Sequence, residues 1–297
     1  MTLLRQTLLA ALLALAIGTP AAAVDMPVPA SGIPGVSDAQ LSPDYWVARL
    51  ADADKPVLDR AAIAALNERV ARLDPSMHDI RHLPATLPRT QVTGWIGKLT
   101  TRPTKPLFDA EGKPVDASTI DAILGNAALD AVPAQVTPRY GMAVRRAALR
   151  GYPTDRRVFS RAGDTDIDRF QESTLFPGDP VVAVHTSKDG QWTFVVSARY
   201  AAWVRGDEIA YGDAAAIFAH ADASPYRVIT GAKPKTVYTP EAPAVSELQL
   251  DMGTRVPLDT TAPPDQPVNG QSPYTSWVLS LPAVSYTHLT LPTNREV

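Results

Sequence analysis

Cysteine is absent from the 297-residue sequence. The chain can therefore form no disulfide bond, and it has neither a thiolate nucleophile nor a thiolate metal ligand. No cysteine is present to carry a lipid anchor either. Any stable fold has to come from the burial of apolar surface.

A surplus of basic residues is also missing. The 28 lysines and arginines are outnumbered by 31 acids, which gives a formal net charge of -3. The basic residues are scattered along the chain, whereas nucleic-acid-binding domains carry clustered positive charge. We therefore expect no nucleic-acid partner.

Beyond residue 23, no segment has the ~18 consecutive apolar residues that a membrane-spanning helix needs. The first 23 residues contain Arg5, the apolar stretch Leu8 to Ile17 and the small residues Ala21 to Ala23, which is the pattern of an export signal. We predict a signal peptide over 1–23 and a proline-rich leader over 24–36. The mature protein is expected to be secreted, periplasmic or extracellular, with no membrane partner.

The segment 37–138 has the pattern of a mostly helical module. Ser42-Pro43-Asp44 has the N-cap residue and the first-turn proline of a short helix. Apolar residues then recur every three or four positions between Asp59 and Leu73. Proline, threonine and glycine punctuate Pro84 to Pro114, which predicts extended chain and turns. Ser118 is the predicted cap of a further helix.

From residue 139 the hydrophobic period changes from 3.6 to two. Five short strands, among them 142–149, 180–186, 191–197 and 201–204, predict an SH3-like barrel over 139–210. Lys188-Asp189-Gly190 is the predicted hairpin turn, and a long loop runs from Pro153 to Pro177. A second β series follows over 211–283, with strands predicted at 226–230, 236–239, 248–252, 255–258 and 276–281. The expected fold class is therefore α+β and multidomain, with a helical N-terminal module followed by two small all-β SH3-like barrels, the second incomplete.

Residues 284–293 read VSYTHLTLPT, which resembles one reading frame of a transposon-type sequencing adapter. A segment of that origin was never selected to bury its side chains. We therefore expect 284–297 to be a non-native tail that does not pack on the rest of the chain. Native sequence is expected to stop near Pro282, in a gene that continued.

Two pairs of residues invite a functional interpretation but favour a structural one. His78 and His82 have a spacing that can present two imidazoles to a metal on one helix face. Prolines crowd that segment, and no third ligand suggests itself, so we predict no metal and no cofactor. Trp192 and Trp203 lie on predicted strands, where packing in the core is favoured over ligand binding.

Four phrases in and around the long loop are YGMAVRRA (140–147), GYPTD (151–155), DIDRFQES (166–173) and LFPGDPV (175–181). Together they resemble the first bacterial SH3 (SH3b) domain of multidomain NlpC/P60 peptidases. Residues 37–138 resemble the N-terminal stabilising module of that family. The second SH3b domain is resembled by MGTRVPL (252–258) and NGQSPY (269–274).

The resemblance implies a secreted, cell-wall-associated enzyme that cleaves the D-glutamyl–diamino acid bond of peptidoglycan stem peptides. The family uses a cysteine thiolate, a histidine base and a polar residue that orients the histidine, all on a domain after the second SH3b domain. We therefore expect no catalytic residue in this chain, and as partners the stem peptides and a missing catalytic domain. Two alternatives remain open, a non-catalytic peptidoglycan-binding SH3b protein and a periplasmic structural scaffold.

The acidic long loop supplies the candidate site. In the family, an acid of the first SH3b domain, which borders the catalytic cleft, pairs with the free amine of the stem peptide's L-alanine. The resemblance assigns this role to Glu172, with Gln171, Tyr140 and Phe170 as further substrate-binding candidates. Because a free carboxylate can make a charge-assisted bond to an ammonium, we expect Glu172 to be exposed and unpaired with lysine or arginine. The alternative is a solvated loop whose acids only confer solubility.

Overall fold

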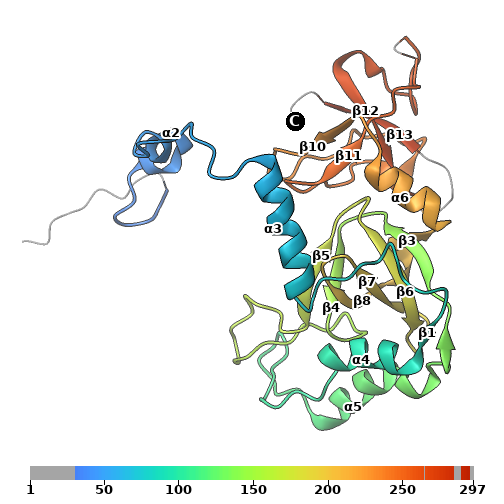
Figure 1. Cartoon of the computed structure of the whole chain (residues 1–297). Helices are drawn as coiled ribbons and strands as arrows, with labels where there is room; N and C mark the ends of the chain where they lie inside the picture. The colour runs from blue at the N-terminus through green and yellow to red at the C-terminus, as the bar shows by residue number, and fades with distance from the viewer. Residues whose placement is uncertain (1–30, 264, 284–288, 295–297) are drawn as a thin grey trace, which may run out of the picture. The chain divides into compact units, whose positions relative to one another are not determined.

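The computed structural model describes residues 31–263, 265–283 and 289–294. The chain separates into two units, residues 1–65 and 66–297, and Figure 1 shows the elements of both. The predicted signal peptide and most of the leader lie outside the described residues. No helix in the described ranges is long and apolar enough to cross a membrane.

The first unit contains short helices with little burial of their own. Helix η1 (Asp38–Leu41) precedes α2 (Pro43–Val47), which begins as predicted, because the Ser42 hydroxyl accepts a hydrogen bond from the backbone of Asp44 at 3.3 Å. Helix α3 (Arg60–Leu73) extends from this unit into the second. Its apolar side chains remain between 41% and 68% exposed, at positions Ile63, Leu66, Val70 and Leu73.

The second unit begins with a helical part. Its elements are β1 (Leu87–Pro88), α4 (Arg89–Leu99), α5 (Ala117–Asn126), η2 (Leu129–Ala131) and β2 (Gln135–Val136). The prediction of extended chain from Pro84 to Pro114 was wrong for α4. Val92 and Ile96, one turn apart, are fully buried, and such packing outweighs the low helix propensity of the two glycines in this helix. Asp116, rather than Ser118, caps α5, accepting from the backbone of Thr119 at 2.7 Å.

A seven-stranded antiparallel sheet follows, in the order β5-β4-β8-β7-β6-β3-β9. The predicted first strand is divided into two, because the chain turns after Ala143, and the long loop carries a strand of its own. The strands are β3 (Arg139–Ala143), β4 (Ala147–Arg150), β5 (Gln171–Leu175), β6 (Pro180–Thr186), β7 (Trp192–Ser197), β8 (Ala201–Arg205) and β9 (Ile209–Tyr211), with η3 (Gly206–Glu208) before the last.

Two glycines of this sheet occupy positions that disfavour a residue with a side chain. Gly190, in the predicted hairpin turn between β6 and β7, has a φ of +72°, which side-chain-bearing residues rarely adopt. Gly141 lies where β3 pairs with β9. A Cβ atom there would come within 2.7 Å of the Ile209 side chain and 2.8 Å of the Ala210 carbonyl oxygen, so only glycine allows this pairing.

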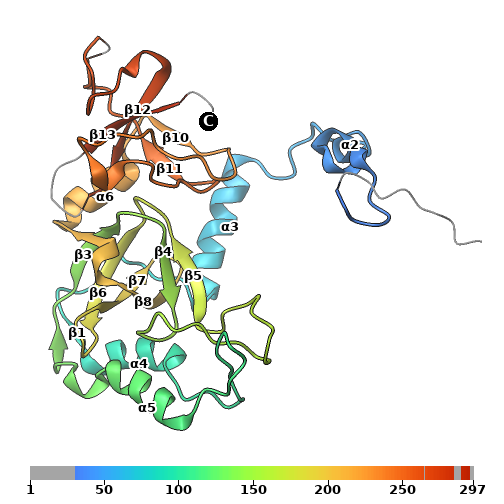
Figure 2. The same cartoon turned by 180° about the vertical axis from the view of Figure 1, so that it is seen from behind.

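The central strands of the sheet are buried on both faces. On one face, Val181, Val195 and Val204 belong to one hydrophobic cluster. The opposite face contributes to a second cluster that includes Val92 and Ile96 of α4. Helices α4 and α5 lie beside this part of the sheet in both views (Figures 1 and 2). The helical module and the first barrel therefore share a core across the expected boundary at residue 138.

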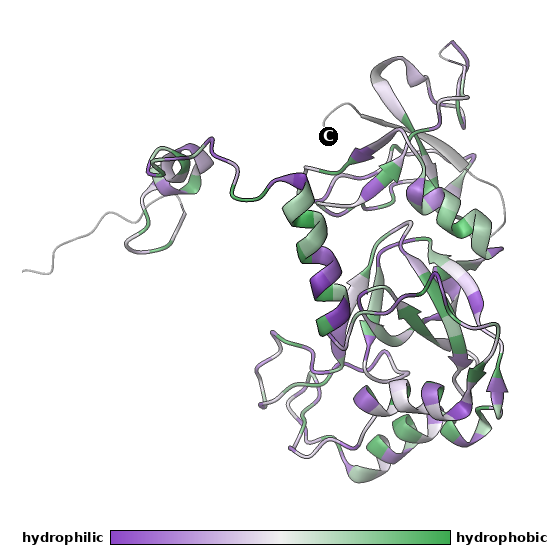
Figure 3. Cartoon of the chain, viewed as in Figure 1, coloured by the Kyte–Doolittle hydropathy of each residue, from purple (hydrophilic) through white to green (hydrophobic). Residues whose placement is uncertain are grey.

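Trp203 lies where the helical part packs against the sheet. It is fully buried, and its indole nitrogen donates to the Thr100 hydroxyl at 3.0 Å. That hydroxyl in turn donates to the backbone carbonyl of Gly151 at 2.8 Å. Trp203 and Trp192, which is 2% exposed, are thus core residues as predicted. Figure 3 shows the hydrophobic character of the central strands.

The second β series is smaller than the first barrel. Helix α6 (Ala214–Asp222) leads into it, and its elements form the two-stranded ladders β10–β11 and β12–β13. The strands predicted over 236–239 and 248–252 were wrong, since that region holds one isolated bridge between Lys235 and Gln249. The remaining elements are β10 (Tyr226–Val228), η4 (Pro243–Val245), β11 (Arg255–Pro257), η5 (Pro273–Thr275) and β12 (Ser276–Leu281).

The expectation that the 284–297 tail does not pack on the chain was wrong for its middle part. Residues 284–288 and 295–297 lie outside the described residues, whereas β13 (Leu289–Asn294) pairs antiparallel with the whole of β12. A strand edge presents unpaired N–H and C=O groups to any extended segment. Backbone pairing of this kind therefore does not require side chains selected for the purpose.

Candidate ligand-binding site on the first barrel

The long loop of the first barrel is held by one of its acids. Asp168 pairs with Arg150 at 2.9 Å, and the two side chains are only 9% and 7% exposed. The other carboxylate oxygen accepts from the backbone N–H groups of Val158 and Phe170, at 3.2 Å and 3.0 Å. Asp168 therefore has a structural role, fixing the loop on which the candidate site lies.

Phe170 is a core residue rather than a contact for a ligand. It is 1% exposed and stacks on the Tyr152 ring, with the centroids 4.1 Å apart. Both rings belong to a cluster with Ile120 and Ile123 of α5. The candidate role of Phe170 in touching substrate is corrected accordingly. Its burial instead sets the position of β5, which begins at the next residue.

Glu172 is exposed on β5, which is the geometry that the sequence led us to expect. Its carboxylate accepts a hydrogen bond from the Tyr200 hydroxyl at 2.8 Å. The same carboxylate lies over Gly151, where an added Cβ would come within 3.2 Å of Glu172 Oε1. Glu172 forms no ion pair with any residue that the structure describes. A charged acceptor is therefore available at this rim, and its role in binding remains a prediction.

Tyr200 is the residue of this site that sequence reasoning missed. It lies in the turn between β7 and β8, where its backbone N–H donates to the Ser197 hydroxyl at 3.0 Å. Burial, together with the hydrogen bond to Glu172 and its negative charge, raises the pKa of Tyr200 to about 12. The phenol therefore stays protonated at physiological pH and fixes the orientation of the carboxylate. A tyrosine in a turn carries no sequence signal that would have identified it.

The other two candidates do not converge on Glu172. The side chain of Gln171 is exposed and donates to the backbone carbonyl of Ser173 in its own strand. Tyr140 lies on β3, which four other strands separate from β5 in the order of the sheet. There it is half-buried and packs edge-on against Phe218 of α6, with centroids 5.8 Å apart. The structure therefore does not place Tyr140 beside Glu172.

A cavity of about 320 Å³ is lined by Tyr200, whose hydroxyl donates to the Glu172 carboxylate. Ser173 and Thr174 of β5 line it together with Arg199 and Tyr200 of the turn, and apolar atoms come from Leu149, Leu175 and Phe176. A carboxylate at the edge of a mixed cavity can hold a cationic group while the cavity takes the adjoining part of a ligand. We define Glu172, Tyr200 and this cavity as the acidic rim.

A wider groove of about 760 Å³ lies between α5, the start of the long loop and the β6–β7 hairpin. Asn126, at the end of α5, bridges the groove. Its side chain donates to the Pro153 carbonyl at 2.9 Å and to the Asp189 carboxylate at 3.1 Å, and it accepts from the backbone of Asp189 at 3.1 Å. Because the helical module binds its own hairpin here, this groove is partly occupied from within the chain.

The two histidines with helical spacing do not meet. His82 contacts the Asp79 carboxylate at 2.8 Å, and His78 packs edge-on against Trp95 at 5.7 Å between ring centroids. Burial, with a contribution from Lys98, lowers the pKa of His78. In the described part of the chain, no group of three potential metal ligands is present.

Residues 157–205 match the family model of an SH3 domain of the SH3b1 type. The matched segment includes β5 to β8 and therefore both Glu172 and Tyr200. The first barrel is thus an SH3b domain.

Among solved structures, the chain is similar to an NlpC/P60 endopeptidase from Photobacterium damselae subsp. piscicida, with a TM-score of 0.52 and 19% sequence identity. The similarity covers 80% of the present chain and 54% of that endopeptidase, so the chain spans about half the length of its neighbour. At this identity the likeness concerns the fold. No curated protein matches the chain.

Proposed function

We propose that the chain is the substrate-positioning and cell-wall-binding front part of a secreted NlpC/P60 cysteine endopeptidase. The enzyme would act on D-glutamyl–diamino acid bonds of peptidoglycan stem peptides, with its catalytic residues on a domain outside this sequence. The proposal is supported by the SH3b domain over 157–205 and by a fold shared with an NlpC/P60 endopeptidase over 80% of the chain. It places the protein in the periplasm or outside the cell, in contact with the wall.

The free carboxylate of Glu172 is the observation that carries this proposal. The loop contains a second acid for comparison, Asp168, whose two oxygens are taken by Arg150 and by two backbone N–H groups. Glu172 accepts one hydrogen bond, from the Tyr200 phenol, and has no cationic partner among the described residues. An exposed carboxylate without a cationic partner is the group that binds an ammonium best.

Tyr200 adds a second acceptor to the rim. Its hydroxyl hydrogen is directed at Glu172, so the lone pairs of its oxygen remain available. An ammonium group carries three donors, and it could bond to the Glu172 carboxylate and to the Tyr200 oxygen together. We infer that the rim binds the N-terminal L-alanine amine of a stem peptide that has been released from its sugar.

The test is a titration of the purified chain with the tripeptide L-alanyl-γ-D-glutamyl-diamino acid and with its N-acetylated form. Glu172→Gln should weaken binding of the free tripeptide by about tenfold, because it removes the charge and keeps the shape. Binding of the acetylated peptide should not change. Glu111, an equally exposed acid, provides the matched control Glu111→Gln. Equal losses on both peptides would contradict the amine-binding role.

The second candidate is a non-catalytic peptidoglycan-binding SH3b protein. It is favoured by one observation, the absence of cysteine from all 297 residues, which leaves the chain without the family's nucleophile. The downstream genomic sequence separates the two candidates. An open reading frame with a cysteine followed by a histidine supports the peptidase, and an early natural stop codon supports the binding protein.

A further inference from the structure

Arg199 occupies an unusual position beside the acidic rim. Its side chain is 65% exposed at the turn between β7 and β8. Three cavities, of about 310, 500 and 320 Å³, each have Arg199 in their lining. The guanidinium therefore lies where three hollows of the second unit converge.

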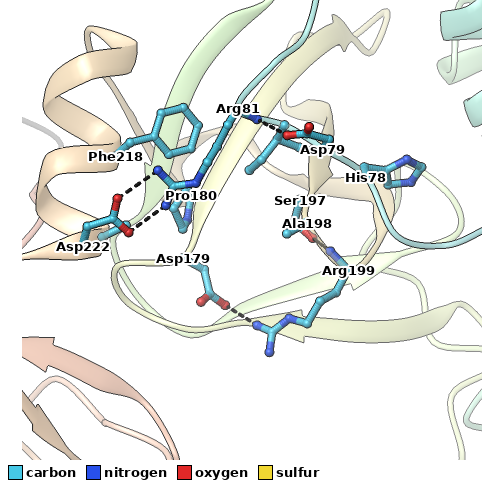
Figure 4. Close-up of a pocket in the computed structure, with 12 residues that line it drawn as sticks. His78, Asp79, Arg81, Asp179, Pro180, Ser197, Ala198, Arg199, Phe218 and Asp222 are labelled. Carbon is cyan, nitrogen blue, oxygen red and sulfur yellow. Dashed lines mark hydrogen bonds and ion pairs between the residues drawn. The ribbon is translucent and has the colours of Figure 1, made fainter. Parts of the chain in front are cut away.

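In the 310 Å³ cavity, Arg81 and Asp79 already have partners (Figure 4). Arg81 makes two hydrogen bonds to Asp222, at 2.9 Å and 2.7 Å. Asp79 contacts His82, outside the cavity, at 2.8 Å. Arg81 thus has little capacity left for an incoming anion.

Arg199 is only partly engaged. Its Nη2 donates to Asp179 at 3.2 Å, and that carboxylate oxygen also accepts from the backbone of Phe176 at 2.9 Å. Nη1 and Nε have no hydrogen bond to any described residue. A guanidinium has five N–H donors in a fixed planar fork that suits a carboxylate. Most of this fork is available at the cavity mouth.

Arg199 and the Glu172 carboxylate are linked through Tyr200. Arg199 precedes Tyr200 in the chain, and both line the 320 Å³ cavity together with Ser173, the residue after Glu172. Tyr200 is hydrogen-bonded to Glu172. Arg199 therefore lines the same cavity as Tyr200, whose hydroxyl donates to the Glu172 carboxylate.

We propose that Arg199 binds a free carboxylate of the same peptide whose N-terminal amine pairs with Glu172. This inference rests on the proposed function and deepens it by naming the substrate class. In a stem peptide, the γ-linked second residue carries a free carboxylate close to the N-terminal amine. The site is thus specific for peptides in which that group is a carboxylate, and it disfavours those in which it is a carboxamide.

The experiment compares two dipeptides, L-alanyl-D-glutamate and L-alanyl-D-isoglutamine, which differ only in that the α-carboxylate of the first is a carboxamide in the second. Binding to the purified chain is measured by NMR titration. The wild-type chain should prefer the carboxylate by about tenfold. Arg199→Gln should abolish this preference, and Arg199→Lys, which keeps the charge and loses the planar fork, should retain part of it. Arg161→Gln, at another exposed arginine, is the matched control and should behave as wild type.

The outcomes separate this inference from the function on which it rests. Suppose that Glu172→Gln weakens the binding of both dipeptides while Arg199→Gln leaves the preference for the carboxylate intact. The role of Arg199 is then limited to its ion pair with Asp179, and the inference fails while the proposed function stands. If the wild-type chain binds neither dipeptide, the proposed function fails, and the inference fails with it. A loss of folding in Arg199→Gln would appear in its amide spectrum, and Arg199→Lys then decides the question.

Discussion

The two β regions of the chain differ in how their strands are paired and in how they are buried. In the first barrel, strands β6, β7 and β8 lie between two hydrophobic clusters, one of which is shared with α4. The second region has one cluster, formed by Ile229, Ala242, Val245, Leu250, Val256, Leu279 and Leu281. Its ladders have two strands each.

This difference indicates why the candidate site lies on the first barrel. A strand buried on both faces has little freedom to shift, so the turn that carries Arg199 and Tyr200 has a firm base. Isolated two-stranded ladders are marginally stable, and the second region relies on its one cluster and on contacts with its neighbours. Among these, Arg255 donates to the backbone carbonyls of Ala221 and Ala223.

The largest effect is expected from a substitution in the core that the sheet shares with the helical module. Trp203→Ala removes a fully buried side chain that packs on Phe194 at 5.4 Å and bonds to Thr100. We expect a loss of about 3–5 kcal/mol in the free energy of unfolding. Urea unfolding followed by circular dichroism measures it. A loss below about 1 kcal/mol would show that the helical module and the sheet do not share a cooperative core.

The next prediction contrasts the two acids of the long loop. Asp168→Ala leaves Arg150 charged and buried without its partner, which should cost about 3 kcal/mol or more. Glu172→Ala should change stability by less than about 0.5 kcal/mol, because its carboxylate is exposed. Thermal melts of both variants provide the comparison. Similar losses for the two would remove the distinction between a structural and a free acid.

A smaller effect is expected in the second β region. Leu250→Ala should cost about 2–3 kcal/mol, since Leu250 is 1% exposed in that region's single cluster. Hydrogen exchange should accelerate in β10 to β12, while β6 to β8 keep their protection. Acceleration across both regions would mean that they unfold as one unit.

The smallest prediction concerns pH and Glu208, which lies next to β9 of the first barrel. Burial, with the negative charge of Asp207, raises the pKa of Glu208 from 4.5 to about 7. The folded chain then holds this proton more tightly than the unfolded chain, so the contribution to stability falls as pH rises from about 4.5 to about 7. Glu208→Gln should match wild type at pH 5 and melt at a higher temperature at pH 8. An identical difference at both pH values would contradict this assignment.

Local patterns predicted part of the fold. The strands predicted at 180–186 and 191–197, joined by the Lys188-Asp189-Gly190 turn, match β6 and β7 nearly to the residue. Helix α4 was missed, since its stability comes from burying Val92 and Ile96 against the sheet rather than from its own residues. Contacts of that kind are not visible in a local window.

The candidate site was predicted in the same partial way. The family resemblance selected Glu172, and the structure shows it free of charged partners among the described residues. Phe170 was misassigned. The sequence of the loop does not show whether this aromatic side chain is buried or faces solvent. Tyr200 and Arg199 were missed, because the turn between β7 and β8 is distant from the loop in sequence and meets it only through the fold.

The most direct test of the central claim is an amide NMR titration of the full chain with the free tripeptide. The acidic rim should respond, with saturable shifts at Glu172, Ser173 and Tyr200, while Lys188 and Asp189 in the wider groove stay unchanged. Shifts centred on Lys188 and Asp189, with the rim unaffected, would contradict the account and move the binding site to the groove that Asn126 bridges.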